Sequence, residues 1–319
     1  MPKLGVGILG VGKLSCKTLI PAFKFCDEVK LVALGSRNPI RAKSKIKAKE
    51  TDLFFGSYDE VLSHSEVQIV YIVLPNHLHA EWSIKAMNQG KAVLCEKPLC
   101  MNLLEMEKIK EASNATGQLF AEAFMYRFHP QHQKVKEILA SGVLGELQLF
   151  RAQFSYFLDD PTNIRLKPDC GGGALRDVGC YLIDSLLWLS GKEVSSLVAT
   201  KKVGETGTDE STCIQVDVSG GLKAQLFCST RSSRENWYSL VGEFGSIDVP
   251  QAYIPASGKQ VCLILKTPRG QEAIKVPGVN TYATQMDEFS KCVARGKDIS
   301  IGDPLYFNEA LHHSLHKII

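Results

Sequence analysis

A glycine-rich turn near the start of the chain limits the possible folds more than any other feature. The apolar run 5–9 predicts a buried strand, residues 10–15 form the turn, and a helical pattern follows. Glycines at such a junction let the backbone bend sharply and approach a pyrophosphate closely. Ser15 stands where a third glycine or alanine is usual and is small enough for helix and strand to pack. We predict dinucleotide binding, with a plain glycine turn as the alternative. The predicted contacts are Gly10, Gly12, Lys13 and Leu14.

Short apolar runs alternate with amphipathic stretches as far as residue 120. The pattern predicts strands at 5–9, 31–34, 69–74, 92–95 and 119–123, and helices at 13–25, 39–49, 78–88 and 103–115. Strands that alternate with helices form a parallel sheet covered by helices. We predict that residues 1–123 form a Rossmann domain that binds the dinucleotide.

The second half has the periodicity of strands that follow one another. It predicts strands at 146–157, 211–218, 223–229, 238–241 and 261–266, and helices at 131–140, 175–189, 281–293 and 304–317. Strands without intervening helices favour antiparallel pairing. We therefore predict an α/β protein whose residues 124–319 form a second domain, of α+β type, with a large, mainly antiparallel sheet.

Composition argues against several classes of partner. The 319 residues include 37 Lys and Arg against 34 Asp and Glu, and this net charge of +3 gives no basic footprint for nucleic acid. Ten cysteines without a Cys-x-x-Cys pair favour free thiols in a reducing compartment. Eight histidines form no spacing typical of metal sites, and no stretch reads as a membrane span or signal peptide. We expect a cytoplasmic protein without metal, nucleic acid or membrane.

The residues after the second predicted strand indicate which dinucleotide binds. A carboxylate there would hold a ribose 2′-hydroxyl and repel a phosphate, but the strand runs into Ser36 and Arg37. Together with Arg41 and Lys43 on the next helix, they supply hydrogen bonds and positive charge suited to a 2′-phosphate. We predict NADP, with NAD as the alternative cofactor and a solvated basic helix start as the reading without a cofactor.

Polar groups follow two further predicted strands at the same sheet edge. Pro75, Asn76 and His79 come after the strand 69–74, and Glu96 and Lys97 come after the strand 92–95. We predict that these five residues bind the cofactor. The alternatives are a helix cap for Asn76, a helix-start histidine for His79 and a solvated surface pair for Glu96 and Lys97. A lysine at a strand end can orient a hydroxyl or stabilise an oxyanion.

A triple glycine at residues 171–173 leads into a helical pattern in the second half. Asp177 and Tyr181 are four positions apart there, so on a helix they lie on one face. Both side chains can then point into a cleft together, which makes them candidates for substrate contact.

Taken together, these motifs resemble the glucose-fructose oxidoreductase / inositol dehydrogenase / rhizopine catabolism (Gfo/Idh/MocA) family of NAD(P)-dependent oxidoreductases. The resemblance covers nearly the whole chain. Its marks are the early glycine turn, Pro75-Asn76 with His79, Glu96-Lys97-Pro98, the run Phe124-Met125-Tyr126-Arg127-Phe128-His129-Pro130, the triple glycine with Asp177 and Tyr181, and Tyr282 with Phe289.

The resemblance implies an N-terminal Rossmann domain and a C-terminal domain whose open sheet carries substrate residues and forms a subunit interface. We accordingly expect a homodimer or homotetramer. The resemblance also implies that Lys97 and Asp177 contact the reacting hydroxyl, and that the peptide bond before Pro98 is cis. Many members have histidine where this chain has Tyr181. With a tyrosine at this position, the chain resembles the glucose-fructose oxidoreductase and dimeric dihydrodiol dehydrogenase branches of the family.

Oxidation of a secondary alcohol by a nicotinamide requires a group that takes the hydroxyl proton. A nearby Lys97 ammonium would favour the phenolate of Tyr181, so Tyr181 is the predicted proton shuttle. Asp177 would accept a hydrogen bond from a hydroxyl or orient the lysine. Arg127 and Arg165 are candidates for a substrate carboxylate or phosphate, and a tie between the domains is the alternative for Arg127. The predicted catalytic residues are Lys97, Tyr181 and Asp177, and the predicted substrate-binding residues are Lys97, Arg127, Arg165, Asp177 and Tyr181.

These expectations describe an NADP-dependent oxidoreductase that acts on CH–OH groups of a small-molecule sugar, polyol or trans-dihydrodiol. Two alternatives stay open: a reductase of a sugar nucleotide or of another ketone or imine, and a regulatory NAD(P) sensor without turnover. A sensor needs no proton shuttle, so the presence of Lys97, Asp177 and Tyr181 together argues against it.

Overall fold

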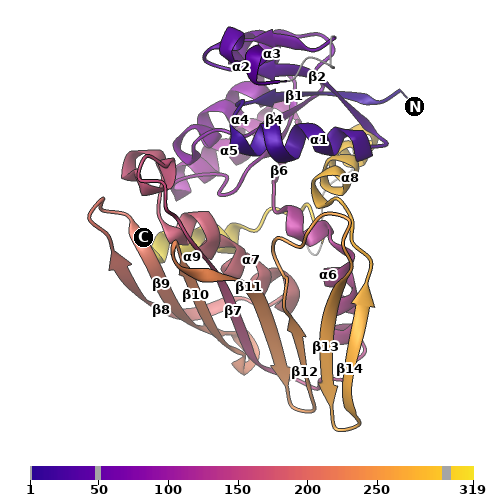
Figure 1. The fold of residues 1–319 in the computed structure, drawn as a ribbon, viewed down its shortest axis with the longest axis vertical. Helices are drawn as coiled ribbons and strands as arrows, with labels where there is room; N and C mark the ends of the chain where they lie inside the picture. The colour runs from indigo at the N-terminus through magenta and orange to yellow at the C-terminus, as the bar shows by residue number, and fades with distance from the viewer. Residues whose placement is uncertain (1, 47–51, 297–302) are drawn as a thin grey trace. The chain divides into compact units, whose positions relative to one another are not determined.

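The computed structural model describes residues 2–46, 52–296 and 303–319. The chain divides into two compact units, each built around one sheet (Figure 1). The first comprises residues 1–125 and 280–307, and the second comprises 126–279 and 308–319. Residues 280–307, which the sequence pattern grouped with the second domain, therefore return to the first unit. The division of cofactor and substrate between two domains stays a prediction.

The first unit contains a parallel sheet of six strands in the order β3-β2-β1-β4-β5-β6. This order, with a reversal between β1 and β4, is that of a Rossmann fold. The strands are β1 (Leu4–Leu9), β2 (Val29–Gly35), β3 (Phe54–Gly56), β4 (Ile69–Ile72), β5 (Ala92–Cys95) and β6 (Phe120–Glu122). The α-helices are α1 (Ile20–Ala22), α2 (Pro39–Lys45), α3 (Tyr58–Ser63), α4 (His79–Asn88), α5 (Leu103–Thr116) and α8 (Thr281–Arg295).

The central strands β4 and β5 are buried at every position, as expected for a parallel sheet covered on both faces. The prediction missed β3 and α3. A sequence signal for α3 existed, because Ser57 and Glu60 form a capping box at its start. The helix predicted over 39–49 ends at Lys45, and residues 47–49 lie outside the described part of the chain.

The second unit contains a mixed, mostly antiparallel sheet in the order β14-β13-β12-β11-β7-β10-β9-β8. Only the β7–β10 pair is parallel among its described pairings. The predicted fold class is thereby confirmed. The strands are β7 (Leu147–Phe157), β8 (Val194–Val203), β9 (Asp209–Val218), β10 (Lys223–Ser229), β11 (Arg231–Gly242), β12 (Ser246–Val249), β13 (Val261–Thr267) and β14 (Gly270–Val276).

One face of this sheet is covered by helices. Alternate residues of β7, such as Phe150 and Phe154, are buried, and Arg151 between them is exposed. The helices of this unit are α6 (Pro130–Ala140), α7 (Cys180–Ser190) and α9 (Glu309–Ile318); α7 packs on β7 and β10, and α9 packs on β8. The prediction started the last helix at residue 304, which is wrong because Asn308 caps α9 through its side chain.

Two features, a membrane-spanning helix and a cluster of metal ligands, are absent from the described residues. No helix there is long and apolar enough to cross a membrane. Among the same residues, no group of three or more His, Cys, Asp or Glu side chains is arranged to hold a metal ion.

Candidate active site

The glycine turn lies where the strand order of the first sheet reverses. Gly10 has a φ of 108°, and a Cβ there would lie 2.3 Å from the Val73 carbonyl oxygen, so only glycine fits. The Gly10 N–H donates to the Gly35 carbonyl at 2.9 Å, and the Val73 N–H donates to the Leu9 carbonyl at 2.8 Å. The turn is therefore fixed between the ends of three neighbouring strands, where a Rossmann fold binds its ligand.

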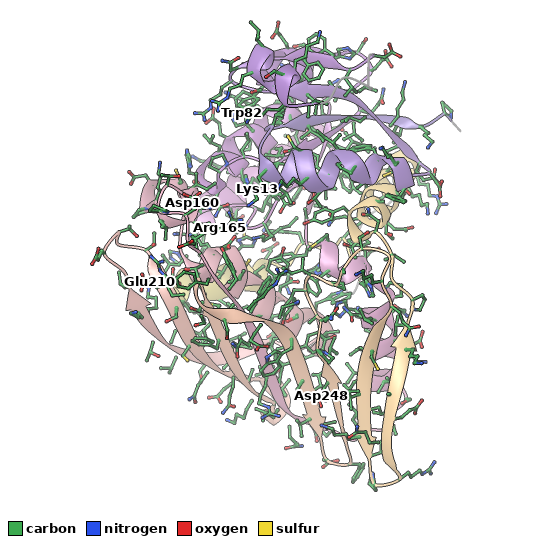
Figure 2. The ribbon with its side chains drawn as sticks, viewed as in Figure 1. Lys13, Trp82, Asp160, Arg165, Glu210 and Asp248 are labelled. Carbon is green, nitrogen blue, oxygen red and sulfur yellow. The ribbon has the colours of Figure 1, made fainter. Side chains whose placement is uncertain are left out.

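Gly12 and Ser15 have different roles in the turn: Gly12 leaves space beside the backbone, and Ser15 stabilises the turn. Gly12 is exposed, and no atom lies within 4 Å of the position that a Cβ would take, which leaves room for a pyrophosphate against the backbone. The Ser15 hydroxyl is buried and donates to the Gly10 carbonyl at 2.5 Å. Ser15 also begins a π-helical turn over Ser15–Leu19, a feature often found at functional sites. Serine at this position thus stabilises the turn. Within the turn, Lys13 is exposed (Figure 2) and Leu14 is half-buried.

The end of β2 carries the residues predicted to select NADP. The Ser36 N–H donates to the Gly56 carbonyl at 2.9 Å, and the Ser36 hydroxyl accepts from the Asn38 N–H at 3.2 Å. Arg37 is exposed and hydrogen-bonds Tyr58; burial raises the pKa of Tyr58, and the positive charge of Arg37 opposes that shift. Hydroxyl and guanidinium groups therefore stand here instead of a carboxylate, which fits a 2′-phosphate.

His79 lies beneath the turn that carries Lys97. Its ring is buried, with Nδ1 2.7 Å from the Pro98 carbonyl oxygen and Nε2 2.8 Å from the Leu74 carbonyl oxygen. Burial lowers its pKa. His79 thus links the ends of β4 and β5, and direct contact with the cofactor stays a prediction. Asn76 is the first residue of the 3-10 turn Asn76–Leu78, whereas Leu78 holds the N-cap position of α4.

The turn after β5 is held by several buried groups. Tyr71 donates its hydroxyl to Glu96 at 3.0 Å, and the Leu99 N–H donates to Glu122 at 2.8 Å. Glu96 is only 7% exposed, so the solvated surface pair is wrong for this residue. Lys97 is half-buried, and the Lys97-Pro98 peptide bond is cis as expected.

Two residues of α8 belong to the same network of buried groups. Gln285 on α8 lies 3.5 Å from the Tyr71 hydroxyl, and burial followed by the negative charge of Glu96 raises the pKa of Tyr282. The first unit therefore needs α8 to complete the surroundings of Glu96. Sequence reasoning did not identify Tyr71 or Glu122, because contacts of this range leave no local pattern.

In the second unit, the triple glycine is required by close packing. A Cβ on Gly172 would lie 2.4 Å from the Arg165 carbonyl oxygen, and a Cβ on Gly173, whose φ is 111°, would lie 2.0 Å from Oδ1 of Asp209. The other oxygen of Asp209 accepts from the Leu175 N–H at 2.8 Å and from the Thr212 hydroxyl at 2.9 Å. Asp209, which the sequence analysis did not single out, thereby fixes the start of the helical segment.

Asp177 lies in a π-helical turn, Leu175–Gly179, that runs directly into α7. Its Oδ2 accepts from the Tyr156 hydroxyl at 2.5 Å and forms an ion pair with Nε of Arg165 at 2.8 Å. Arg165 belongs to the segment that follows β7, as does Asp160 (Figure 2). The negative charge of Asp177 raises the pKa of Arg165, and burial followed by that same charge raises the pKa of Tyr156. Arg165 is thus paired with a proposed catalytic residue.

Tyr181 follows in α7 and is surrounded by aromatic rings. Its ring centroid lies 5.3 Å from that of Phe154, 5.6 Å from that of Tyr253 and 5.8 Å from that of Tyr126. Aromatic pairs at these separations are favourable and fix ring orientation. The direction of the phenol is therefore set by packing within the second unit.

Arg127 forms a buried ion pair with Asp184. Its Nε lies 3.0 Å from Oδ2 of Asp184, a second guanidinium nitrogen bonds Oδ1, and the Tyr126 hydroxyl donates to Asp184 at 2.6 Å. Burial works against the charge on Arg127, but Asp184 outweighs it and raises the pKa of Arg127. This pairing favours a structural role, and substrate binding by Arg127 stays a prediction.

The candidate residues thus form two groups. The first unit holds the glycine turn, Ser36 with Arg37, the Pro75 turn, His79 and the Lys97 turn; the second holds Arg127, Arg165, Asp177 and Tyr181. Four residues that hold these groups in place were not identified from the sequence, namely Tyr71, Glu122, Tyr156 and Asp209.

Two family models match the chain. Residues 4–124 match an oxidoreductase family with an NAD-binding Rossmann fold, GFO_IDH_MocA, and residues 132–248 match the GFO/IDH/MocA C-terminal domain. An uncharacterized oxidoreductase of Rhizobium meliloti is 31% identical over 92% of this chain and 90% of that protein. A D-xylose 1-dehydrogenase (NADP(+)) of Haloferax volcanii is 29% identical over 91% of this chain and 89% of its own length.

A solved structure resembles the whole chain. A tyrosine-to-phenylalanine mutant of a 3-ketoreductase from Actinomadura kijaniata, in complex with TDP-benzene and NADP, has a TM-score of 0.91 at 26% identity. The match covers 99% of this chain and 97% of that one. The same reductase has also been solved with a single lysine replaced by alanine.

Proposed function

Since the chain belongs to the GFO/IDH/MocA oxidoreductase family, we propose that it is an NADP-dependent enzyme. It transfers a hydride between the cofactor and a secondary alcohol or carbonyl of a sugar, polyol or trans-dihydrodiol. The cofactor-binding residues proposed are those at the ends of β1, β2, β4 and β5. The exposed space beside Gly12, with Ser36 and Arg37 at the end of β2, supports NADP.

This proposal rests mainly on the anchored turn that contains Lys97. Buried side chains hold the backbone of Pro98 and Leu99, the two residues that follow the lysine, at the carboxyl end of a Rossmann strand where such folds bind ligands. An ammonium presented from a fixed backbone suits a catalytic group, which must be held in place before the reaction.

The solved reductase supports the pairing of Lys97 with Tyr181. The lysine and the tyrosine that were replaced there are separated along their chain by the same distance as Lys97 and Tyr181 are here. We propose that Lys97, Tyr181 and Asp177 each contact the substrate. The xylose dehydrogenase, named for NADP(+), supports a sugar as substrate.

In the oxidative direction, Tyr181 takes the hydroxyl proton at its phenolic oxygen, and Lys97 holds the oxygen that becomes the carbonyl. The hydrogen on the same carbon leaves as a hydride, so proton and hydride together account for both hydrogens lost by the alcohol. When bound, NADP supplies the hydride acceptor. Asp177 accepts a hydrogen bond from a hydroxyl of the substrate.

A nucleotide-linked keto sugar is the second candidate substrate, with reduction as the direction. The observation in its favour is the 3-ketoreductase structure with TDP-benzene and NADP, which matches nearly the whole of this chain. The half-exposed guanidinium of Arg165 is the group we assign to an anionic part of such a substrate.

Purified protein should be offered NADP or NAD with D-xylose, D-glucose, myo-inositol and trans-1,2-dihydrobenzene-1,2-diol, and NADPH with a TDP-linked keto sugar. We expect turnover of at least one of these compounds and tighter binding of NADP than of NAD. Equal or tighter binding of NAD would refute the cofactor assignment. Tight NADP binding without any turnover would favour the sensor.

Replacing Lys97 by methionine should lower turnover by about a hundredfold to ten-thousandfold, while NADP still binds. Lys85→Met is the matched control, because Lys85 is an exposed lysine of the same unit that pairs with Glu81 at 2.8 Å and lies over Trp82 (Figure 2 labels Trp82). Unaffected turnover in Lys97→Met would reject the catalytic role.

A further inference from the structure

The hydrogen bonds around Asp177 assign a role to Tyr156 and a further role to Arg165. We propose that Tyr156 and Arg165 are positioning residues, which fix the Asp177 carboxylate as a hydrogen-bond acceptor for a hydroxyl of the substrate. Both donate to the same oxygen, Oδ2, at 2.5 Å and 2.8 Å. The inference rests on the proposed function, because it assumes that Asp177 contacts the substrate.

The two donors come from different elements, so together they fix the carboxyl plane. Tyr156 lies on β7, one residue before the strand ends, and Arg165 lies on the segment beyond it. The Arg165 backbone is itself held, because its carbonyl accepts from the Gly173 N–H at 2.9 Å and its N–H donates to Asn163 at 3.1 Å. The Oδ2 oxygen is therefore held by donors from two segments of the second unit.

The charges keep this carboxylate ionised. Asp177 raises the pKa of Arg165 through its negative charge, and by reciprocity the guanidinium favours the charged form of Asp177. The Tyr156 hydroxyl is a donor in this pair, and a charge-assisted bond of this kind also favours the anion. Tyr156 and Arg165 therefore both favour Asp177 as a hydrogen-bond acceptor, and the proposal leaves proton transfer to Tyr181.

A double-mutant cycle distinguishes this role from ordinary structural support. Tyr156→Phe keeps the ring and removes only the hydroxyl, Arg165→Gln removes the charge, and Asp177→Asn removes the acceptor charge. Each of the first two is measured alone and together with Asp177→Asn, using D-xylose and saturating NADP. Tyr238→Phe is the matched control, because it removes another buried tyrosine hydroxyl of the same unit, one bonded to His132 at 2.8 Å.

We expect Tyr156→Phe and Arg165→Gln each to lower kcat/KM by about tenfold to a hundredfold, the range for losing a hydrogen bond to a charged group. In the Asp177→Asn background, the same changes should cost less than about threefold, because the group they act through is gone. Arg165→Lys should recover part of the loss, since it restores the charge without the planar fork. Tyr238→Phe should show the same change in both backgrounds.

Equal losses with and without Asp177→Asn would overturn the inference and leave both residues with a structural role. The same cycle is also measured by denaturant unfolding, which needs no substrate. There, Tyr156→Phe and Asp177→Asn should shift the midpoint less than additively. Such coupling without turnover of any compound would refute the proposed function and uphold the contacts, whereas turnover without coupling in either measurement would refute the contacts alone.

Discussion

The turn that carries Lys97 and the helical segment that carries Asp177 are held in different ways. In the first unit, His79 and Glu122 hold backbone groups of Pro98 and Leu99, beside the lysine. In the second unit, Tyr156 and Arg165 hold the carboxylate of Asp177 itself. One region is thus anchored through its main chain, and the other through the side chain proposed to act.

The difference follows from the chemistry of the two groups. Lysine reaches its target on a flexible four-carbon stem, so fixing the backbone sets where the stem begins. A carboxylate on a short stem has two directional acceptor oxygens, and its orientation needs donors of its own. Changes near Lys97 should therefore disturb folding and turnover together, whereas changes at the Asp177 donors should mainly disturb turnover.

Two glycines whose Cβ positions would conflict with neighbouring atoms give the strongest test of this contrast. Gly10→Ala would place a Cβ against a backbone carbonyl, which cannot turn away, whereas Gly173→Ala would meet the Asp209 side chain, which can. We expect Gly10→Ala to lower the free energy of unfolding by about 4 kcal/mol, and Gly173→Ala by about 2 kcal/mol. Denaturant unfolding measures both.

Gly117→Ala is the control for these two variants. Its φ is 67°, and the space around its Cβ position is open, so only the backbone conformation is unfavourable. We expect about 1 kcal/mol. A larger loss for Gly173→Ala than for Gly10→Ala would contradict the distinction between main-chain and side-chain anchoring.

The Glu122 anchor offers a test of intermediate size. Glu122→Ala leaves the buried Leu99 N–H without this acceptor, so we expect the free energy of unfolding to fall by about 2 kcal/mol and kcat to fall as well. Glu122→Gln keeps an acceptor oxygen and should recover most of both losses. Unfolding and steady-state kinetics measured on the same preparations check the result. Normal kcat in a destabilised Glu122→Ala would separate the anchor from the site.

Acid should reveal a further difference, centred on a buried histidine of the second unit. Burial lowers the pKa of His132 from 6.5 to about 3, whereas in the unfolded chain it stays near its ordinary value. Between these values only the unfolded state binds the proton. The contribution of His132 to the free energy of unfolding is therefore greatest above about pH 6.5, and it decreases by about 1.4 kcal/mol for each unit by which the pH is lowered. Unfolding midpoints at pH 7 and pH 5 measure the slope.

The non-titrating variant His132→Asn should flatten this dependence. Asparagine has an acceptor for the Tyr238 hydroxyl and a donor for the Ala252 carbonyl, the two partners of the histidine ring. Exposed His313→Asn is the control and should leave the slope unchanged. An unaltered slope in His132→Asn would assign the acid sensitivity to other groups.

Local patterns in the sequence predicted much of the fold. Strand β5 was predicted with its observed bounds because a short apolar run in a covered parallel sheet has clear limits. β8 and β14 were missed because most of their residues are exposed, so they lack the alternation that marks a half-buried strand. The family was identified correctly from motifs spread along the whole chain.

The proposed site was less accessible to sequence reasoning. Glycines, Lys97, Asp177 and Tyr181 stand in recognisable local contexts, so they were singled out. Tyr156 and Asp209 reach their partners from positions 21 and 34 residues away, and nothing in their own neighbourhoods announces this. His79 was singled out for the cofactor, and the position of its buried ring between two carbonyl oxygens emerged only with the fold.

The return of α8 to the first unit has a consequence for biosynthesis. Asp287 on this helix accepts from the N–H groups of Asp27 and Glu28, at 2.9 Å each. A ribosome makes the entire second sheet before it makes this helix, so the nascent first unit lacks α8 until the second sheet has been made. A fragment that stops at residue 125 lacks α8, so we expect it to fold incompletely and to bind chaperones.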